Sequence, residues 1–159
     1  MHIFCTEVSK YDSFQNGWGY WEGDQGRSFP KEYAWTQCRL PNGSLMLSVA
    51  DIPIAGVHFT GIIGNILWKG QEYRLATYLG ARPLQIHKGR ILIAQGKLEL
   101  EVCLPAAEGH PLKAPAKGAM MRTIHENASS KAFYRFQQKG QTLFAFETEQ
   151  ASFEYEYPS

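Results

Sequence analysis

Apolar and polar residues alternate with a period of two along most of this chain, which predicts β-strands. Residues 97–102 (KLELEV) alternate strictly, and in residues 153–157 (FEYEY) three aromatic side chains face away from two glutamates. A period of two places alternate residues on one face of a strand, whereas an amphipathic helix needs a period of 3.6. Because no window of about twelve residues shows the helical period, the chain is predicted to be all-β.

Turn signals divide the alternating runs into short strands. Asn42-Gly43 predicts a type I′ hairpin, since both central residues of that turn need a positive φ. Three Lys-Gly pairs separate other strand-like runs in the same way: Lys69-Gly70, Lys88-Gly89 and Lys139-Gly140. The spacing predicts a single antiparallel domain over residues 1–159, a barrel or sandwich, closed or partly open, of roughly ten strands.

Two segments need a separate interpretation. Residues 45–68 carry only one formal charge, but prolines and glycines interrupt them, so they are predicted to form two buried strands and not a membrane span. Residues 104–118 contain three prolines and are predicted to be a long irregular loop, which is either functional or a surface crossover.

Composition excludes several classes of function. With 44% apolar and 19% charged residues and a net charge of +1, the chain is globular and has no basic excess for nucleic acid. The three cysteines are scattered and the histidines lack ligand spacing, so we expect no disulfide, no metal and no cofactor. The first ten residues do not resemble a signal peptide, which predicts a cytoplasmic protein without an integral membrane segment.

The richest candidate chemistry lies in residues 20–38, YWEGDQGRSFPKEYAWTQC, where five of nineteen residues are aromatic. Strands predicted at 17–23 and 33–39 are expected to pair, with a loop between them. Their shared face would carry Trp18, Tyr20 and Glu22 from the first strand and Tyr33, Trp35 and Gln37 from the second. An aromatic wall with a few polar groups is typical of a small-molecule pocket. The alternative is that the aromatic residues form core and that the carboxylates lie at a solvated strand end.

A further polar candidate is Arg122. On a strand at 119–127 it shares a face with Glu126, and it could reach into a barrel and meet Glu22. A solvated surface pair is the alternative.

Two motifs in this chain resemble the tocopherol cyclase family. The family signature reads approximately E-x-N-W-G-x-x-F-P-x-x-W-x-W-x-Q-C, and seven residues match it in register: Glu22, Gly26, Phe29, Pro30, Trp35, Gln37 and Cys38. Asp24, Gln25 and Tyr33 depart from it. Residues 109–115 (GHPLKAP) are similar to a second family motif, G-x-P-L-x-A-P.

The resemblance implies a lipocalin-like (calycin-type) antiparallel fold and an apolar ligand. The family closes a prenylated hydroquinone by protonating an alkene, which needs an acid and aromatic faces that stabilise a carbocation. Glu22 or Asp24 would be the catalytic acid, and Tyr20, Tyr33 and Trp35 the aromatic walls, with Phe29 also at the ligand.

We therefore expect lipocalin-like binding of a small apolar or amphipathic molecule. The alternatives are a cyclase or isomerase acting on a prenylated quinol or other lipid, and a structural interaction module. The chain resembles the second half of the family's proteins, so its uncovered surface predicts a homodimer.

Overall fold

The computed structural model describes residues 19, 27–105 and 109–158, and within them it confirms the all-β prediction. The regular elements are ten strands and one 3₁₀ turn, η1 (Thr77–Leu79). The strands are β1 (Tyr33–Leu40), β2 (Gly43–Ile54), β3 (Val57–Trp68), β4 (Gln71–Ala76), β5 (Arg82–His87), β6 (Arg90–Gln95), β7 (Leu98–Cys103), β8 (His110–Ala116), β9 (Ala119–Gln138) and β10 (Gln141–Tyr155).

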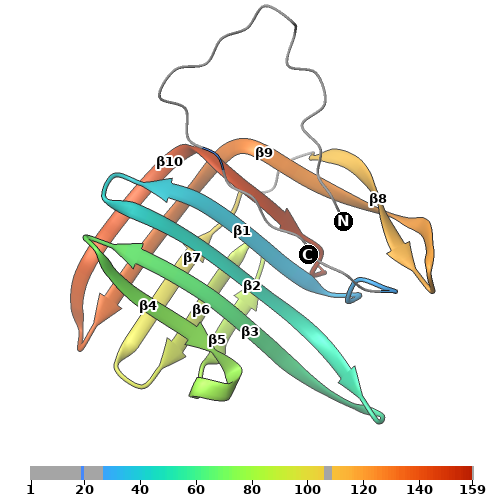
Figure 1. The fold of residues 1–159 in the computed structure, drawn as a ribbon, viewed down its shortest axis with the longest axis horizontal. Coiled ribbons are helices and arrows are strands. Elements are labelled where there is room, and N and C mark those ends of the chain that lie inside the picture. The colour runs from blue at the N-terminus through green and yellow to red at the C-terminus, as the bar shows by residue number, and fades with distance from the viewer. Residues whose placement is uncertain (1–18, 20–26, 106–108, 159) are drawn as a thin grey trace, which may run out of the picture.

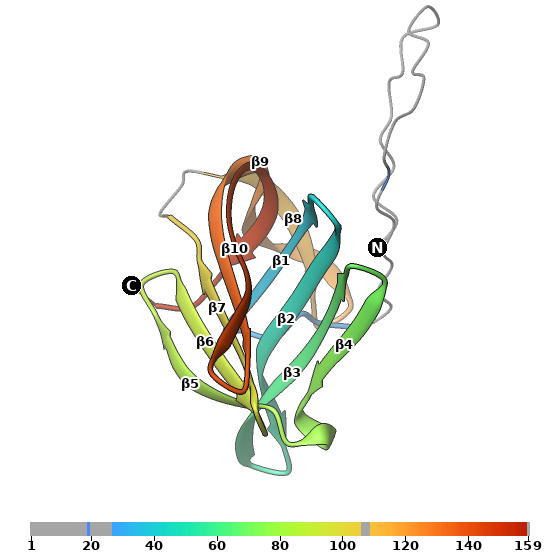
Figure 2. The same cartoon turned by 90° about the vertical axis from the view of Figure 1, so that its left-hand side faces the viewer.

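All ten strands belong to one antiparallel sheet that is not closed. Its order is β4-β3-β2-β1-β10-β9-β7-β6-β5, and β8 pairs with the first part of β9. The sheet curls so that β5, β6 and β7 lie behind β2, β3 and β4 (Figure 1), and the same curl is visible after a quarter turn (Figure 2). One apolar core fills the inner side of this curl.

The edge strand β4 meets β6, the second-last strand at the other end of the sheet, through a side chain and not through a backbone ladder. Gln95, the last residue of β6, accepts a hydrogen bond from the amide of Ala76 at 2.9 Å and donates one to the carbonyl of Arg74 at 2.9 Å. Both partners belong to β4. A primary amide has a donor and an acceptor, so it can replace a backbone peptide at this seam.

The observed turns match the predicted ones at the three Lys-Gly pairs, whereas the first hairpin turn differs from the prediction at Asn42-Gly43. Lys69, Lys88 and Lys139 have positive φ, as type I′ turns require. The first turn instead consists of Pro41 and Asn42, because Leu40 pairs with Gly43, and Asn42 is not among the residues with positive φ. Gly43 begins β2, where a Cβ atom would lie 1.8 Å from the carbonyl oxygen of Leu67.

Residues 45–68 lie in β2 and β3, which confirms the two strands, but most residues of β3 are not buried, contrary to the prediction. The prediction of an irregular loop over 104–118 is wrong in part. Residues 110–116 form β8, an edge strand that pairs only with β9. The long strand β9 pairs with β8 through its first part and with β7 through its last part, and Ser129 between them has a φ of +67°. The β8–β9 hairpin therefore extends away from the rest of the sheet (Figure 1).

The two faces of β1 are unlike. The core face carries Ala34, Cys38 and Leu40, together with Thr36, whose hydroxyl lies 2.6 Å from that of Tyr134. The odd-numbered residues lie on the outer face, which is the face opposite the core. Over Ala34–Gln37, β1 pairs with β2 on one edge and with β10 on the other. The expectation that residues 33–39 pair with 17–23 therefore does not hold over Ala34–Gln37.

Candidate functional site

The structure brings together three of the residues that the sequence singled out. Phe29 and Tyr33 form an edge-to-face ring pair with centroids 5.9 Å apart. The guanidinium carbon of Arg122 lies 5.7 Å from the centroid of the Tyr33 ring. The other candidates in this region, Trp18, Tyr20, Glu22 and Asp24, lie outside the described residues.

The predicted aromatic wall on β1 does not face the core. Tyr33, Trp35 and Gln37 share one face, as alternation predicts, but it is the outer face. Gln37 donates to the hydroxyl of Ser152 at 3.2 Å, and Trp35 lies opposite Glu154 in the β1–β10 ladder. A pocket inside the curl of the sheet is therefore not lined by these residues.

A buried pair of Tyr33 and Glu154 anchors the outer face. The Tyr33 hydroxyl donates to a carboxylate oxygen of Glu154 at 2.5 Å, and the two residues are only 5% and 7% exposed. Burial raises the pKa of Tyr33 far above its ordinary value, and the hydrogen bond to Glu154 and the negative charges of Glu154 and Glu156 raise it further. The positive charge of Arg122 opposes this shift. Tyr33 is thus a permanently neutral donor to a buried carboxylate.

Arg122 joins β9, β10 and the segment before β1. Its guanidinium donates to the carbonyl of Pro30, to the carbonyl of Lys31 at 2.7 Å and to the carboxylate of Glu156 at 3.1 Å. Charged hydrogen bonds of this kind fix geometry well because the guanidinium is planar. In this structure Arg122 acts as a clamp between segments.

A second group of polar residues lies on the inner face, at the end of the core where β10 finishes. Tyr155 and Tyr157 pack against the apolar core, with ring centroids 5.8 Å apart. Both hydroxyl oxygens are buried and have no hydrogen-bond partner in the described part of the chain. Burial raises the pKa of Tyr157 to about 12, and the negative charges of Asp51 and Glu32 contribute.

An acid–histidine pair completes this group. A carboxylate oxygen of Asp51 lies 2.5 Å from Nδ1 of His58. Both residues continue the inner face of β2 and β3 beyond the buried Val49 and Ile62, and the amide of Asp51 donates to the carbonyl of Glu32 at 2.9 Å. We call Tyr155, Tyr157, Asp51 and His58 the tyrosine site.

The sequence contained part of the signal for the tyrosine site. The FEYEY alternation placed Tyr155 and Tyr157 on one face with Phe153, which is a core residue here. Asp51 and His58 gave no signal, because they are seven residues apart and meet only across the β2–β3 hairpin.

The two motifs that carry the family resemblance touch at one described position. The amide of Phe29, in the middle of the first motif, donates to the carbonyl of Pro115, the last residue of the second, at 3.1 Å. No protein-family model, curated protein or solved structure matches this chain. In the described ranges, no helix is long and apolar enough to cross a membrane, and no group of three or more His, Cys, Asp or Glu side chains could hold a metal ion.

Proposed function

We propose that this protein binds a small amphipathic molecule at the tyrosine site, within a lipocalin-like, partly open barrel. The apolar part of the ligand lies against the rings of Tyr155 and Tyr157 and the end of the core. Its polar group accepts hydrogen bonds from the two phenol hydroxyls. Few convergent polar groups on an apolar wall are typical of small-molecule sites.

The observation that carries the proposal is the pair of buried hydroxyls, of Tyr155 and Tyr157, that find no partner in the part of the chain that the structure describes. Native proteins satisfy most buried polar groups, because an unpaired one costs about 1–3 kcal/mol. Two such hydroxyls on neighbouring rings are difficult to explain as packing alone, since phenylalanine would fill the same space. A ligand atom that accepts both hydrogen bonds removes this cost in the bound state.

The electrostatics of the site favour a neutral acceptor over an acid. The raised pKa keeps the Tyr157 hydroxyl protonated at neutral pH, so it can donate. The carboxylates of Asp51 and Glu32 act on the same hydroxyl and repel a ligand carboxylate. A carbonyl or quinone oxygen on an apolar body fits both conditions.

The resemblance to tocopherol cyclases supports this ligand class, because a prenylated quinol is a polar ring on an apolar chain. The cyclase alternative depends on Glu22 or Asp24 as the acid, and both lie outside the described residues.

The test uses prodan, a naphthalene probe with one carbonyl acceptor, whose emission reports both an apolar environment and hydrogen bonding to that carbonyl. We expect wild type to bind prodan, and Tyr155→Phe/Tyr157→Phe to bind it about 30-fold more weakly, which corresponds to two lost hydrogen bonds of about 1 kcal/mol each. Tyr78→Phe is the matched control, because Tyr78 lies on η1 and is 73% exposed.

Equal affinity in the double variant and wild type would overturn the proposal, as would equal weakening in the control. Native mass spectrometry of gently purified protein is a second test. A small molecule that co-purifies with wild type but not with the double variant would support the same site.

A further inference from the structure

Two hairpin ends expose large apolar side chains at one end of the molecule. At the β8–β9 hairpin, Met120 and Met121 are 54% and 70% exposed, and at the β2–β3 hairpin, Ile54 and Val57 are 58% and 68% exposed. Both hairpins extend to the right-hand end in Figure 1. Exposing large apolar residues to water at a turn is unfavourable, which is why turns are usually polar.

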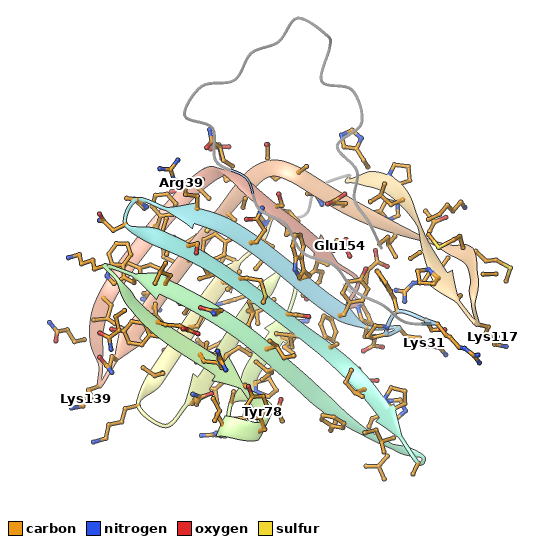
Figure 3. All side chains as sticks on the ribbon, viewed as in Figure 1. Lys31, Arg39, Tyr78, Lys117, Lys139 and Glu154 are labelled. Carbon is orange, nitrogen blue, oxygen red and sulfur yellow. The ribbon has the colours of Figure 1, made fainter. Side chains whose placement is uncertain are left out.

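Four basic side chains surround the β8–β9 hairpin end. Arg27, Lys31, Lys113 and Lys117 are all exposed, and none of them forms an ion pair with any residue that the structure describes. Lys31 and Lys117 lie at the same end of the molecule (Figure 3).

Hydrogen bonds fix the backbone of the basic residues close to the β8–β9 hairpin. The amide of Gly118 donates to the carbonyl of Arg27 at 2.8 Å, and the amide of Lys117 donates to the hydroxyl of Ser28 at 2.8 Å. Arg122 binds the carbonyl of Lys31 at 2.7 Å. These contacts fix the backbone of three of the basic residues, Arg27, Lys31 and Lys117, beside the hairpin that carries the two methionines.

We propose that this end of the molecule docks on an anionic lipid membrane. We call the surface the docking end and define it by Met120, Met121, Ile54 and Val57 with Arg27, Lys31, Lys113 and Lys117. Met120 and Met121 insert between the lipid headgroups, and the four basic side chains bind the lipid phosphates. Apolar insertion combined with basic charge is the physical basis of peripheral membrane binding.

The shape of the docking end favours a lipid surface over other anionic partners. Its apolar residues stand at the ends of hairpins and can enter a soft headgroup layer, whereas a stable protein interface needs a broad complementary surface. At the β8–β9 hairpin end, residues 116–121 carry no aromatic ring on which a nucleic-acid base could stack.

The opposite end of the molecule supplies a matched comparison. Lys97 and Lys139 lie together there, since the amide of Lys139 donates to the carbonyl of Lys97 at 2.7 Å, and Lys139 lies far from Lys117 in Figure 3. Their turns carry glycine and lysine but no large apolar residue. Charge without an apolar tip is therefore present in the same protein.

The experiment measures partitioning of the full chain onto vesicles by co-sedimentation. The vesicles contain either phosphatidylcholine alone or phosphatidylcholine with about 30 mol % phosphatidylglycerol. We expect wild type to bind the anionic vesicles and to bind the neutral ones at least tenfold more weakly. Lys113→Glu/Lys117→Glu is expected to weaken binding at least tenfold, because each basic residue contributes about fivefold near an anionic surface. Met120→Ser/Met121→Ser is expected to weaken it by about tenfold or more.

The control is Lys97→Glu/Lys139→Glu, which changes the net charge by the same amount and should leave binding within about twofold of wild type. Equal losses in this control and in Lys113→Glu/Lys117→Glu would show attraction by net charge alone and would overturn the proposal. Unchanged binding in the methionine variant would also overturn it. Stronger retention on single-stranded polyuridine than on vesicles, with no effect of the methionines, would assign the surface to nucleic acid instead.

This inference is independent of the proposed ligand. Vesicle binding does not involve Tyr155 or Tyr157, and prodan binding does not involve Met120 or Met121. Failure of one experiment therefore leaves the other intact.

Discussion

The same substitution, tyrosine to phenylalanine, is expected to have opposite effects on stability at Tyr33 and at Tyr157. At Tyr33 it removes the hydroxyl that donates to Glu154 at 2.5 Å, while both residues are almost fully buried. A hydrogen bond to a charged group contributes about 1.5–3 kcal/mol, and the carboxylate that loses its donor stays buried. Tyr33→Phe should therefore lower the free energy of unfolding by about 2 kcal/mol.

At Tyr157 the substitution removes a buried hydroxyl that has no partner among residues 19, 27–105 and 109–158. The unfolded chain can hydrogen-bond this hydroxyl to water, whereas the described part of the folded protein leaves it unpaired. Tyr157→Phe keeps the ring and its packing against the core, so it should raise the free energy of unfolding by about 1 kcal/mol.

Thermal and urea unfolding of the two variants and wild type, without ligand, would measure both effects. For a chain of this size, the expected changes correspond to a melting temperature about 4–8 °C lower for Tyr33→Phe and about 2–4 °C higher for Tyr157→Phe. A loss of stability in Tyr157→Phe would refute the reasoning, because it would show that its hydroxyl has a partner within the protein. No loss in Tyr33→Phe would show that the short contact with Glu154 contributes nothing net.

Three further predictions concern pH, the seam and self-association. The pKa values of Tyr33 and Tyr157 are raised by folding, so above a pH of about 10 the unfolded chain binds fewer protons than the folded one. The free energy of unfolding should therefore fall as pH rises from about 10 to 12, and urea titrations that show a constant or rising value over this range would contradict the prediction. Gln95→Leu removes both side-chain hydrogen bonds to β4, from the Ala76 amide and to the Arg74 carbonyl, so unfolding in urea should show a loss of about 1–3 kcal/mol. Gln141→Leu, at the exposed first position of β10, should change the free energy of unfolding little. The homodimer remains a prediction, and the exposed apolar side chains of Phe59 and Ile63 on β3 are its candidate interface. Sedimentation equilibrium should show a dimer for wild type and a monomer for Ile63→Lys. A monomeric wild type would contradict the prediction.

Strand positions could be predicted from the sequence wherever alternation and turn chemistry agreed. The segment 45–68 is the clearest example, because its prolines and glycines excluded a long helix and its β-branched residues favoured two strands. β8 was missed because Pro111 and Pro115 suggested a loop. Proline removes a backbone donor, but β8 pairs with β9 along one edge only, so the other edge tolerates the missing donors.

The sequence could not decide which face of β1 points inward. Alternation correctly grouped Tyr33 with Trp35, and their size suggested the interior. The core face instead carries the smaller Ala34 and Thr36, because Tyr134 and Phe153 reach in from β9 and β10 and fill the space. Such compensation between strands depends on tertiary packing and leaves no pattern within a single strand.

The seam at Gln95 gives this sheet a built-in line of weakness. Separating any two neighbouring strands of this sheet breaks a row of backbone hydrogen bonds. Separating β4 from β6 breaks only the two hydrogen bonds of the Gln95 side chain. Amide exchange at Ala76, whose acceptor is that side chain, should therefore report an opening that costs less than global unfolding. The proposed ligand needs a place where the sheet can open reversibly to reach the filled apolar core. The junction at Gln95 is such a place, because breaking two side-chain hydrogen bonds opens it without unfolding the sheet.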